Sequence, residues 1–431
     1  MRKRVLAVLM SVLCLFGLSG CDGITLNIDQ LIMPPSPAGN LGLIQKALYA
    51  FAGNEITLRY PKGGDYRSAF VLYDLNHDGS EEALAFYSTV TEENANMMHV
   101  NFIKKEGETW CSASDYAVEA GAIGSVTFAD LDGDKADEVL IGFTVSTSSS
   151  DKLSVLDFAD AELTPVLTEE YTVCLPVDLR GAGQNDLLLI SRDMTARTAT
   201  AKLFSFRNGE AILCGTCPLD GSVEGYGQPI VSQTSSGQPA VYVDGSKGTE
   251  GTVTEIVMWE NGGLVNPFVG SQSALNVATL RTTADPMGDV NGDGQIEIPR
   301  LLMPVLSPEN DRAVPLTEWL QFDGETLMGV QYDLINRADG YTVTLPPDLA
   351  AAVAIIKTDR ERLFFSYDDK TKTIGESVLT LRSVPTSSGE TDDTWFSVLE
   401  TPQRTVMAKL NAENEFGLTE EAVKKAVKAA E

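Results

Sequence analysis

Short acidic loops recur along the chain, and their side chains offer the clearest chemistry in the sequence. Each loop has oxygen-bearing side chains at its first, third, fifth and ninth positions, a spacing that can direct them to one centre. The loops cover residues 74–82, 130–138 and 289–297. Their candidate metal ligands are Asp74, Asn76, Asp78, Glu82, Asp130, Asp132, Asp134, Glu138, Asp289, Asn291, Asp293 and Glu297. Oxygen ligands in this number and spacing predict a site for a hard cation.

Calcium is the cation that suits these loops best, because it accepts about six to eight oxygen ligands in adaptable geometry. Carboxylates crowded into nine residues repel one another unless a cation neutralises them. A bound ion would convert that repulsion into folding energy. We therefore expect Ca²⁺ as a structural cofactor. Acidic surface turns remain the alternative, since Asp, Asn and Gly favour turns without any metal.

Two other calcium motifs begin in a similar way and are disfavoured. An EF-hand needs a bidentate Glu at the twelfth position, where this chain has Ala85, Ile141 and Arg300. The segment 288–294 also resembles a dockerin loop. Dockerins pair two such loops and follow each with a helix, whereas Pro299 follows this one and no partner loop is near.

The loops form a repeat with two weaker copies. Residues 178–186 keep the acids at the first and ninth positions but lose the oxygens between them, and a fifth candidate lies near 243–246. The starts at 74, 130, 178 and 289 are 56, 48 and 111 residues apart, so the last gap spans two periods. A period near 50 is typical of propeller blades.

Strand pairs with tight turns fill the intervals between the loops. Apolar runs such as 203–206, 256–259 and 319–322 are followed by Asn-Gly or Asp-Gly, which predicts β-hairpins. Together with the motif Asp-x-[Asp/Asn]-x-Asp-Gly-x-x-[Asp/Glu], this arrangement resembles the FG-GAP/VCBS repeat family, the integrin-alpha-like β-propellers. The resemblance covers roughly residues 55–345.

The resemblance implies that each loop joins two strands of a blade and holds calcium. It also implies that the weak copies belong to blades that bind none. The fold class we expect is therefore mainly β, a β-propeller of FG-GAP/VCBS-like blades followed by a small α+β C-terminal module. The expected divisions are 39–345 for an N-terminal helix with the calcium-binding propeller, and 346–431 for the module.

The N-terminus reads as an export signal with a lipid anchor. Residues 1–20 have a basic start and an apolar run that is too short for a comfortable membrane span. Leu18-Ser19-Gly20-Cys21 resembles a bacterial lipobox, which implies lipidation of Cys21 and attachment to the extracytoplasmic face of the cell membrane. The Pro-containing stretch 21–38 would then be a tether.

Helices are expected near both ends of the β region, and the sequence leaves open whether Leu349 to Ile356 forms a short helix or a strand. The apolar spacing of 39–53 predicts a short amphipathic helix that ends at Gly53. A second helix is predicted from Leu418, with Thr419 as its N-cap and lysines toward its end. Four strands are predicted before it, within 363–410.

The sequence contains no catalytic motif that we recognise. His77 and His99 are the only histidines, and each is expected to be structural or solvated. Cys214 and Cys217 have the CxxC spacing of redox and zinc sites, but buried thiols or one local disulfide are the simpler interpretations.

The formal net charge of −29 excludes a nucleic-acid binder that depends on a basic face. The function we expect is that of a binding scaffold for a protein or glycan ligand. The alternative is an extracytoplasmic enzyme that acts on cell-wall or environmental polysaccharide.

Overall fold

The protein is mainly β, as expected. The computed structural model describes residues 39–90, 96–145, 150–159, 162–270, 275–302, 312–386, 394–411 and 413–430. The predicted signal segment 1–20, lipidated Cys21 and tether 21–38 lie outside the described residues. Within the described part of the chain, no helix has the length and apolar character needed to cross a bilayer.

The first half of the described chain forms three antiparallel sheets in chain order. The first sheet contains β1 (Thr57–Leu58), β2 (Phe70–Tyr73), β3 (Glu82–Val90), β4 (Asn96–Glu106) and β5 (Thr109–Glu119). The second contains β6 (Ala122–Ala129), β7 (Glu138–Thr144), β8 (Asp151–Ala159) and β9 (Glu162–Tyr171). The third contains β10 (Val173–Val177), β11 (Asp186–Asp193), β12 (Thr198–Arg207) and β13 (Glu210–Leu219).

Three further antiparallel sheets follow. The fourth contains β14 (Gly225–Tyr226), β15 (Ile230–Gln233), β16 (Pro239–Ser246), β17 (Thr252–Glu260) and β18 (Gly263–Val265). The fifth contains β19 (Glu297–Leu302), β20 (Leu316–Phe322), β21 (Leu327–Asn336), β22 (Tyr341–Leu345) and β28 (Val427–Ala429). The sixth contains β23 (Val353–Lys357), β24 (Glu361–Asp368), β25 (Thr373–Pro385), β26 (Phe396–Glu400) and β27 (Arg404–Leu410). The helical elements are α3 (Asn40–Ala52), η1 (Gly248–Glu250), α4 (Pro347–Ala351) and α5 (Glu420–Ala426).

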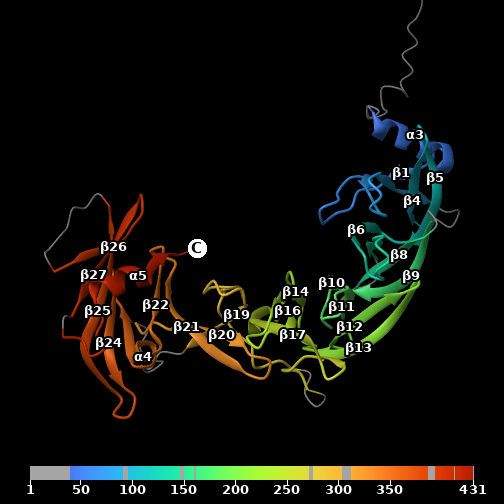
Figure 1. The fold of residues 1–431 in the computed structure, drawn as a ribbon. Helices are drawn as coiled ribbons and strands as arrows, with labels where there is room; N and C mark the ends of the chain where they lie inside the picture. Colours follow the sequence, from blue (N-terminus) through green and yellow to red (C-terminus); the bar gives the residue numbers. More distant parts are fainter. Residues whose placement is uncertain are drawn as a thin grey trace, which may run out of the picture.

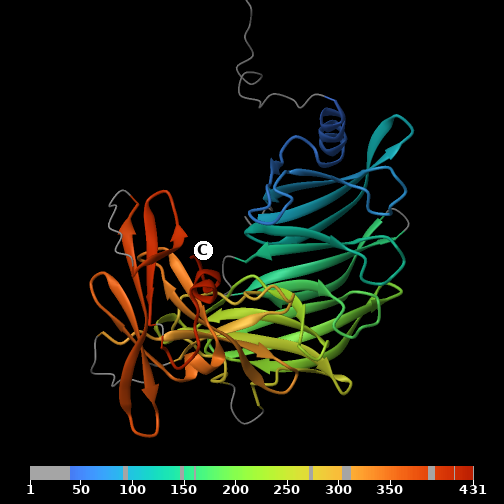
Figure 2. The ribbon, with the colours of Figure 1, turned by 60° about the vertical axis from the view of Figure 1, so that its left-hand side comes forward.

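The sheets follow one another along a curve, with α3 at one end and the sixth sheet at the other (Figures 1 and 2). Each neighbouring pair of sheets shares a hydrophobic core. Leu84, Phe86 and Phe102 of the first sheet pack with Val139 and Ile141 of the second. Equivalent cores join the second to the third sheet, the third to the fourth, the fourth to the fifth and the fifth to the sixth.

Side-chain alternation along β3 explains why α3 covers one face of the first sheet. Successive residues of a strand point to opposite faces, so Leu84 and Phe86 face the second sheet. Ala83 and Ala85 face the other way, where Ile44 and Leu48 of α3 pack on them. The small alanines allow the helix to approach the sheet closely. The helix ends at Gly53 as predicted, where φ is 80°.

The C-terminal segment contains the predicted strands and helix, but it is packed into the rest of the protein. Thr419 caps α5 by accepting a hydrogen bond from the Ala422 N–H (3.2 Å), as predicted. The chain then enters β28, which pairs with β22 of the fifth sheet. Because the fifth and sixth sheets also share a core, the boundary predicted at residue 345 lies inside continuous packing.

Candidate cation-binding loops

The predicted acidic loops occupy equivalent places in four sheets. In each, the residue before the loop pairs across the sheet with the ninth loop position. The pairs are Tyr73 with Glu82, Ala129 with Glu138, Val177 with Asp186 and Gly288 with Glu297. The loops beginning at 74, 130 and 178 connect two strands directly, and the loop at 289 leads into β19. In all four sheets, the same number of residues therefore separates the two paired positions at the ends of the loop.

The first-position aspartates accept backbone hydrogen bonds in every one of these loops. Asp74 accepts from the N–H groups of Asp78 (3.0 Å) and Gly79 (2.9 Å). Asp178 accepts from the same fifth and sixth loop positions, whereas Asp130 and Asp289 accept from the fourth and sixth. A tight loop turns several N–H groups inward, and a carboxylate satisfies them. These bonds fix the aspartate at the centre of the loop.

The other ligand positions are also oriented in the three complete loops. The ninth-position glutamate accepts from the N–H of the second residue, namely Leu75 to Glu82 (3.0 Å), Leu131 to Glu138 (2.6 Å) and Val290 to Glu297 (2.9 Å). The third and fifth positions each accept a bond from the N–H two residues later. All twelve predicted ligands are therefore oriented by hydrogen bonds within their own loops. Among the described residues, only Asp130, Asp132 and Asp134 bring three acidic side chains within metal-binding distance of one another.

The second loop brings its carboxylates closest together. Oxygen atoms of Asp130, Asp132 and Asp134 all lie within 4.8 Å of one another. The loop lacks the glycine expected at its sixth position, and Lys135 takes the left-handed conformation there with φ 78°. Burial raises the pKa of Glu138 to about 8, and the charges of Asp132 and Asp157 add to this shift. Negative charge is therefore costly in this loop unless a cation neutralises it.

Asp157 is a fifth carboxylate at this site, and the sequence analysis missed it. It lies in β8, directly after Leu156, which pairs with Val139 across the sheet. Its pKa is raised by burial and by the charges of Asp132 and Asp134. The residue is an acid between Leu156 and Phe158 and belongs to no loop motif, so only the strand register places it beside the loop.

The last loop also gains a neighbour that the sequence did not indicate. Gln321 of β20 donates hydrogen bonds to Asp293 (2.8 Å) and to Glu297 (2.9 Å). Asn291 donates to the same two carboxylates, each at 3.2 Å. Glu297 is fully buried, and burial is the main cause of its raised pKa. An amide carbonyl on Gln321 is a further oxygen of the type that calcium accepts.

The third loop contains its own cation. Arg180 stands at the third position, and its guanidinium donates two hydrogen bonds to the ninth-position Asp186, at 2.7 and 2.6 Å. Asp186 is buried, so it requires a positive partner or hydrogen bonds. The arginine meets this need, which gives a physical reason for the prediction that this copy binds no metal.

The fifth copy predicted near 243–246 is wrong. These residues lie within β16, and Asp244 forms an ion pair with Arg281 at 2.6 Å. The place equivalent to the acidic loops is 234–238, between β15 and β16, where Gln233 pairs with Pro239. This connection is three residues shorter than the others and has no acid. It closes by two hydrogen bonds, from Thr234 N–H to Gln238 O and from Gly237 N–H to Thr234 O, both 2.8 Å.

Neighbouring loops are joined to one another. Asp137 of the second loop donates its N–H to Leu75 O of the first loop (2.8 Å). Its carboxylate accepts from the Tyr73 hydroxyl (2.6 Å) and lies 3.3 Å from the His77 ring. In the same way, Gln184 of the third loop donates to Leu131 O of the second (2.7 Å). These hydrogen bonds link each of the first three loops to its neighbour, so an ordered loop helps to hold the adjacent loop in place.

The second histidine lies in a polar network on the face of the first sheet that α3 covers. His99 Nδ1 is 2.7 Å from Asp115, and His99 Nε2 is 2.9 Å from the Thr89 hydroxyl. Asp115 also accepts from Tyr87 (2.9 Å) and Asn101 (3.0 Å). This hydroxyl–imidazole–carboxylate order resembles that of hydrolytic triads. The same bonds equally satisfy the polar groups of a packed sheet.

Cys214 and Cys217 are free thiols on β13. Residues three apart on a strand point to opposite faces, and Cys217 is buried whereas Cys214 lies at 3.1 Å from the Ser205 hydroxyl. The CxxC spacing therefore does not bring the two sulfur atoms together. Of the two interpretations left open by the sequence, the structure has thiols rather than a local disulfide.

No family model matches the chain, and no curated protein matches its sequence. A rhamnogalacturonan lyase is similar over 82% of this chain and 91% of its own, at 10% identity and a TM-score of 0.31. The periplasmic gluconolactonase of Pseudomonas aeruginosa is similar over 72% and 94%, at 12% identity and 0.22. A mannose phosphorylase from Leishmania mexicana is similar over 85% and 92%, at 9% identity and 0.18. All three scores are below 0.5, and these likenesses carry no argument about this chain.

Proposed function

We propose that the protein is a calcium-stabilised lipoprotein of blade-like β-sheets, held at the extracytoplasmic face of the cell membrane as a binding scaffold. The observation that carries this proposal is the repeated loop with one register in four sheets. Three copies each carry four side chains with candidate ligand oxygens, and the fourth has an arginine at one of these positions. A surface turn would have no need of such a replacement.

We propose further that these sheets are blades of the FG-GAP/VCBS type. Support comes from the repeated antiparallel sheets, from the core between each pair, and from the placement of the loops before β3, β7, β11 and β19. In a propeller every blade packs on two neighbours. Here α3 covers the face of the first sheet that points away from the second. The row of blades would then be capped by a helix at this end.

Calcium would act as a structural ion in these loops. The second site has four carboxylates from the loop, on Asp130, Asp132, Asp134 and Glu138, and a fifth on Asp157 of β8, and they repel one another unless a cation neutralises them. Oxygen ligands of this kind suit calcium rather than zinc or copper, which prefer nitrogen and sulfur. Because neighbouring loops are hydrogen bonded, ion binding would stabilise the sheets as a set.

Chelation tests the calcium proposal. EDTA should lower the melting temperature of the purified protein, and added calcium should restore it. The variant Asp132→Asn/Asp134→Asn should lose part of this response. Glu108→Gln, which removes an exposed acid from the β4–β5 turn, is the matched control and should respond as the wild type does. An unchanged melting temperature in EDTA would rule out a structural calcium role.

The lipid anchor rests on the lipobox resemblance at Cys21 and is tested separately. Replacement of Cys21 by Ser should move the protein from the membrane fraction to the soluble fraction and abolish incorporation of a labelled fatty acid. Membrane association that persists without labelling would contradict the anchor.

A binding role and an enzymatic role make opposite predictions in one screen. The scaffold should bind a protein or glycan without turnover, because rigid sheets present their connecting loops for recognition. The alternative is an enzyme that acts on cell-wall or environmental polysaccharide; a hydroxyl–imidazole–carboxylate arrangement such as Thr89–His99–Asp115 would hydrolyse acyl esters on it rather than glycosidic bonds. Hydrolysis that is lost in Asp115→Asn, with the fold intact by circular dichroism, would establish the enzyme and overturn the scaffold. Binding with no product formed would support the scaffold.

A further inference from the structure

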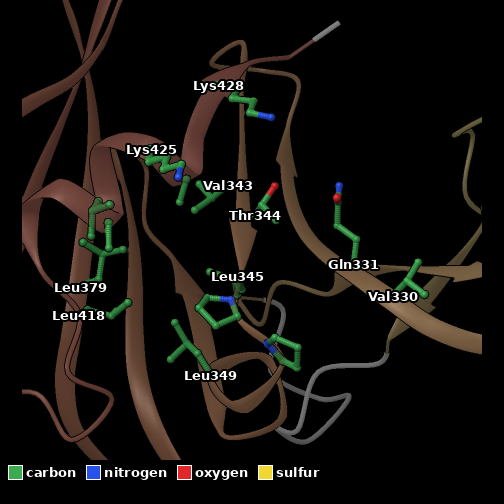
Figure 3. A pocket seen from close by; sticks show the side chains of 15 residues that line it. Val330, Gln331, Val343, Thr344, Leu345, Leu349, Leu379, Leu418, Lys425 and Lys428 are labelled. Atoms are coloured by element: carbon green, nitrogen blue, oxygen red, sulfur yellow. The ribbon is translucent and has the colours of Figure 1, made fainter. Parts of the chain in front are cut away.

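A cavity of about 490 Å³ lies between the fifth and sixth sheets, beside α5 (Figure 3). Its walls are mainly apolar side chains from β22, β25, α5 and the segment around α4. The apolar lining residues include Val343, Leu345, Leu349, Leu379, Leu418 and Val423. The volume falls within the range of about 300–1,000 Å³ that is typical of small-molecule sites. It lies well away in the fold from the acidic loops of the first three sheets.

Two lysines stand on one side of this apolar cavity. Figure 3 shows Lys425 and Lys428 on one side and Leu345, Leu349 and Leu418 on the other. Both lysines are exposed to solvent. Within the described residues, neither ammonium group forms an ion pair, whereas the adjacent Lys424 is paired with Glu420 at 2.6 Å. The cavity therefore combines an apolar interior with positive charge that the protein does not neutralise.

The lining of the cavity is positively charged although the protein is strongly acidic. The chain carries a formal net charge of −29, with 61 acidic and 32 basic residues. Lys425 and Lys428 place two positive charges at the cavity, and none of its lining residues is acidic. The charge complements an anion, and the apolar walls complement a hydrocarbon body.

We propose that this cavity binds a fatty carboxylate, with its hydrocarbon chain between the sheets and its carboxylate at Lys425 and Lys428. The apolar walls would take the chain out of water, and the ammonium groups would form charge-assisted hydrogen bonds with the head group. A cationic amphiphile of equal length would meet like charge and be rejected. This proposal does not depend on whether the acidic loops bind calcium.

Calorimetric titration with dodecanoate tests this site in the full chain carrying Cys21→Ser, so that no attached lipid competes. Below its micelle concentration, dodecanoate should bind with one molecule per chain. Dodecyltrimethylammonium, with the same chain length and opposite charge, should bind at least about tenfold more weakly. Butyrate, with the same head group and a short chain, should show no measurable binding. Failure of dodecanoate to bind, or equal binding of the cation, would overturn the proposal.

Three variants assign the binding to this cavity. Lys425→Ala/Lys428→Ala should weaken dodecanoate binding by about tenfold or more, as expected when a charge-assisted contact is lost. Lys424→Ala, the matched control on the same helix, should bind as the wild type does. Ala426→Leu adds a larger apolar side chain to the wall without breaking helix propensity, and it should reduce binding. Binding unchanged in both the lysine and the Ala426 variants would show that the site is elsewhere.

Discussion

Arg180 and Asp186 form a two-pronged ion pair within the third loop, with guanidinium to carboxylate distances of 2.7 and 2.6 Å. In the three complete loops the residue at the position of Arg180 carries a side-chain oxygen, and the position of Asp186 is held by a glutamate. A positive side chain thus occupies the loop that has lost its intermediate ligands. The pairing supports the view that all four loops were built around positive charge.

Removal of this arginine should destabilise the protein whether or not calcium is present. Arg180→Ala leaves the buried Asp186 without its partner, which should cost about 2 kcal/mol of unfolding free energy, less than a fully buried pair because Arg180 is partly exposed. Urea unfolding in calcium and in EDTA measures this cost. A loss of unfolding free energy that is seen in calcium but not in EDTA would show that Arg180 supports a metal site instead.

Asp157 should contribute to calcium binding although it lies on a different strand from the loop. Asp157→Asn should weaken one calcium site by about tenfold, a loss typical of removing a group that supports a metal site. In EDTA the same variant should be more stable than the wild type, because one of five repelling carboxylates has gone. Calcium titration and thermal unfolding check both effects, with Glu108→Gln as the control. Wild-type affinity in the variant would exclude Asp157 from the site.

The contact between the first two loops should be measurable as a coupling energy. Tyr73→Phe removes the hydroxyl that donates to Asp137 at 2.6 Å, and Asp137→Asn changes the acceptor. A double-mutant cycle on unfolding free energy should give a coupling of about 1 kcal/mol. His77→Gln should have a smaller effect, since the His77 side chain is 53% exposed. Additive effects of the two changes would mean that the contact contributes nothing.

Cys217 should be chemically silent at neutral pH, whereas Cys214 should react. Burial raises the pKa of Cys217 to about 12, with a smaller contribution from Glu255. The folded protein therefore keeps the thiol proton after the unfolded chain has lost it, at about pH 8.5. Stability should fall as pH rises from about 8.5 toward 12. Cys217→Ala should flatten this part of the pH profile. Rapid alkylation of Cys217 in the native protein at pH 7 would contradict the burial.

The loops and hairpins could be predicted from sequence because their determinants are local. Asp and Asn at alternating positions, glycine at positive φ and Asn-Gly turns act within a few residues of one another. The same holds for α3, whose apolar spacing and terminal Gly53 lie within one segment. Such features need no knowledge of how distant strands pair.

The remaining parts of the site depend on contacts between strands that are distant in sequence. Asp157 and Gln321 reach their loops only through the register of β8 and β20, and nothing in their neighbouring residues signals this role. The connection at 234–238 has no acid and is three residues shorter than the other loops. The acidic-loop motif therefore could not identify it. Its start lies 56 residues after 178 and 55 before 289. This even spacing of the loop starts is the sequence signal that could have identified the connection.

The most direct test of the calcium account is a crystal structure of the protein grown with calcium. It should show three ions, one in each of the loops 74–82, 130–138 and 289–297, with Asp157 near the second. The loop 178–186 should hold Arg180 against Asp186 and no ion. Empty acidic loops at millimolar calcium, or an ion beside Arg180, would contradict the account.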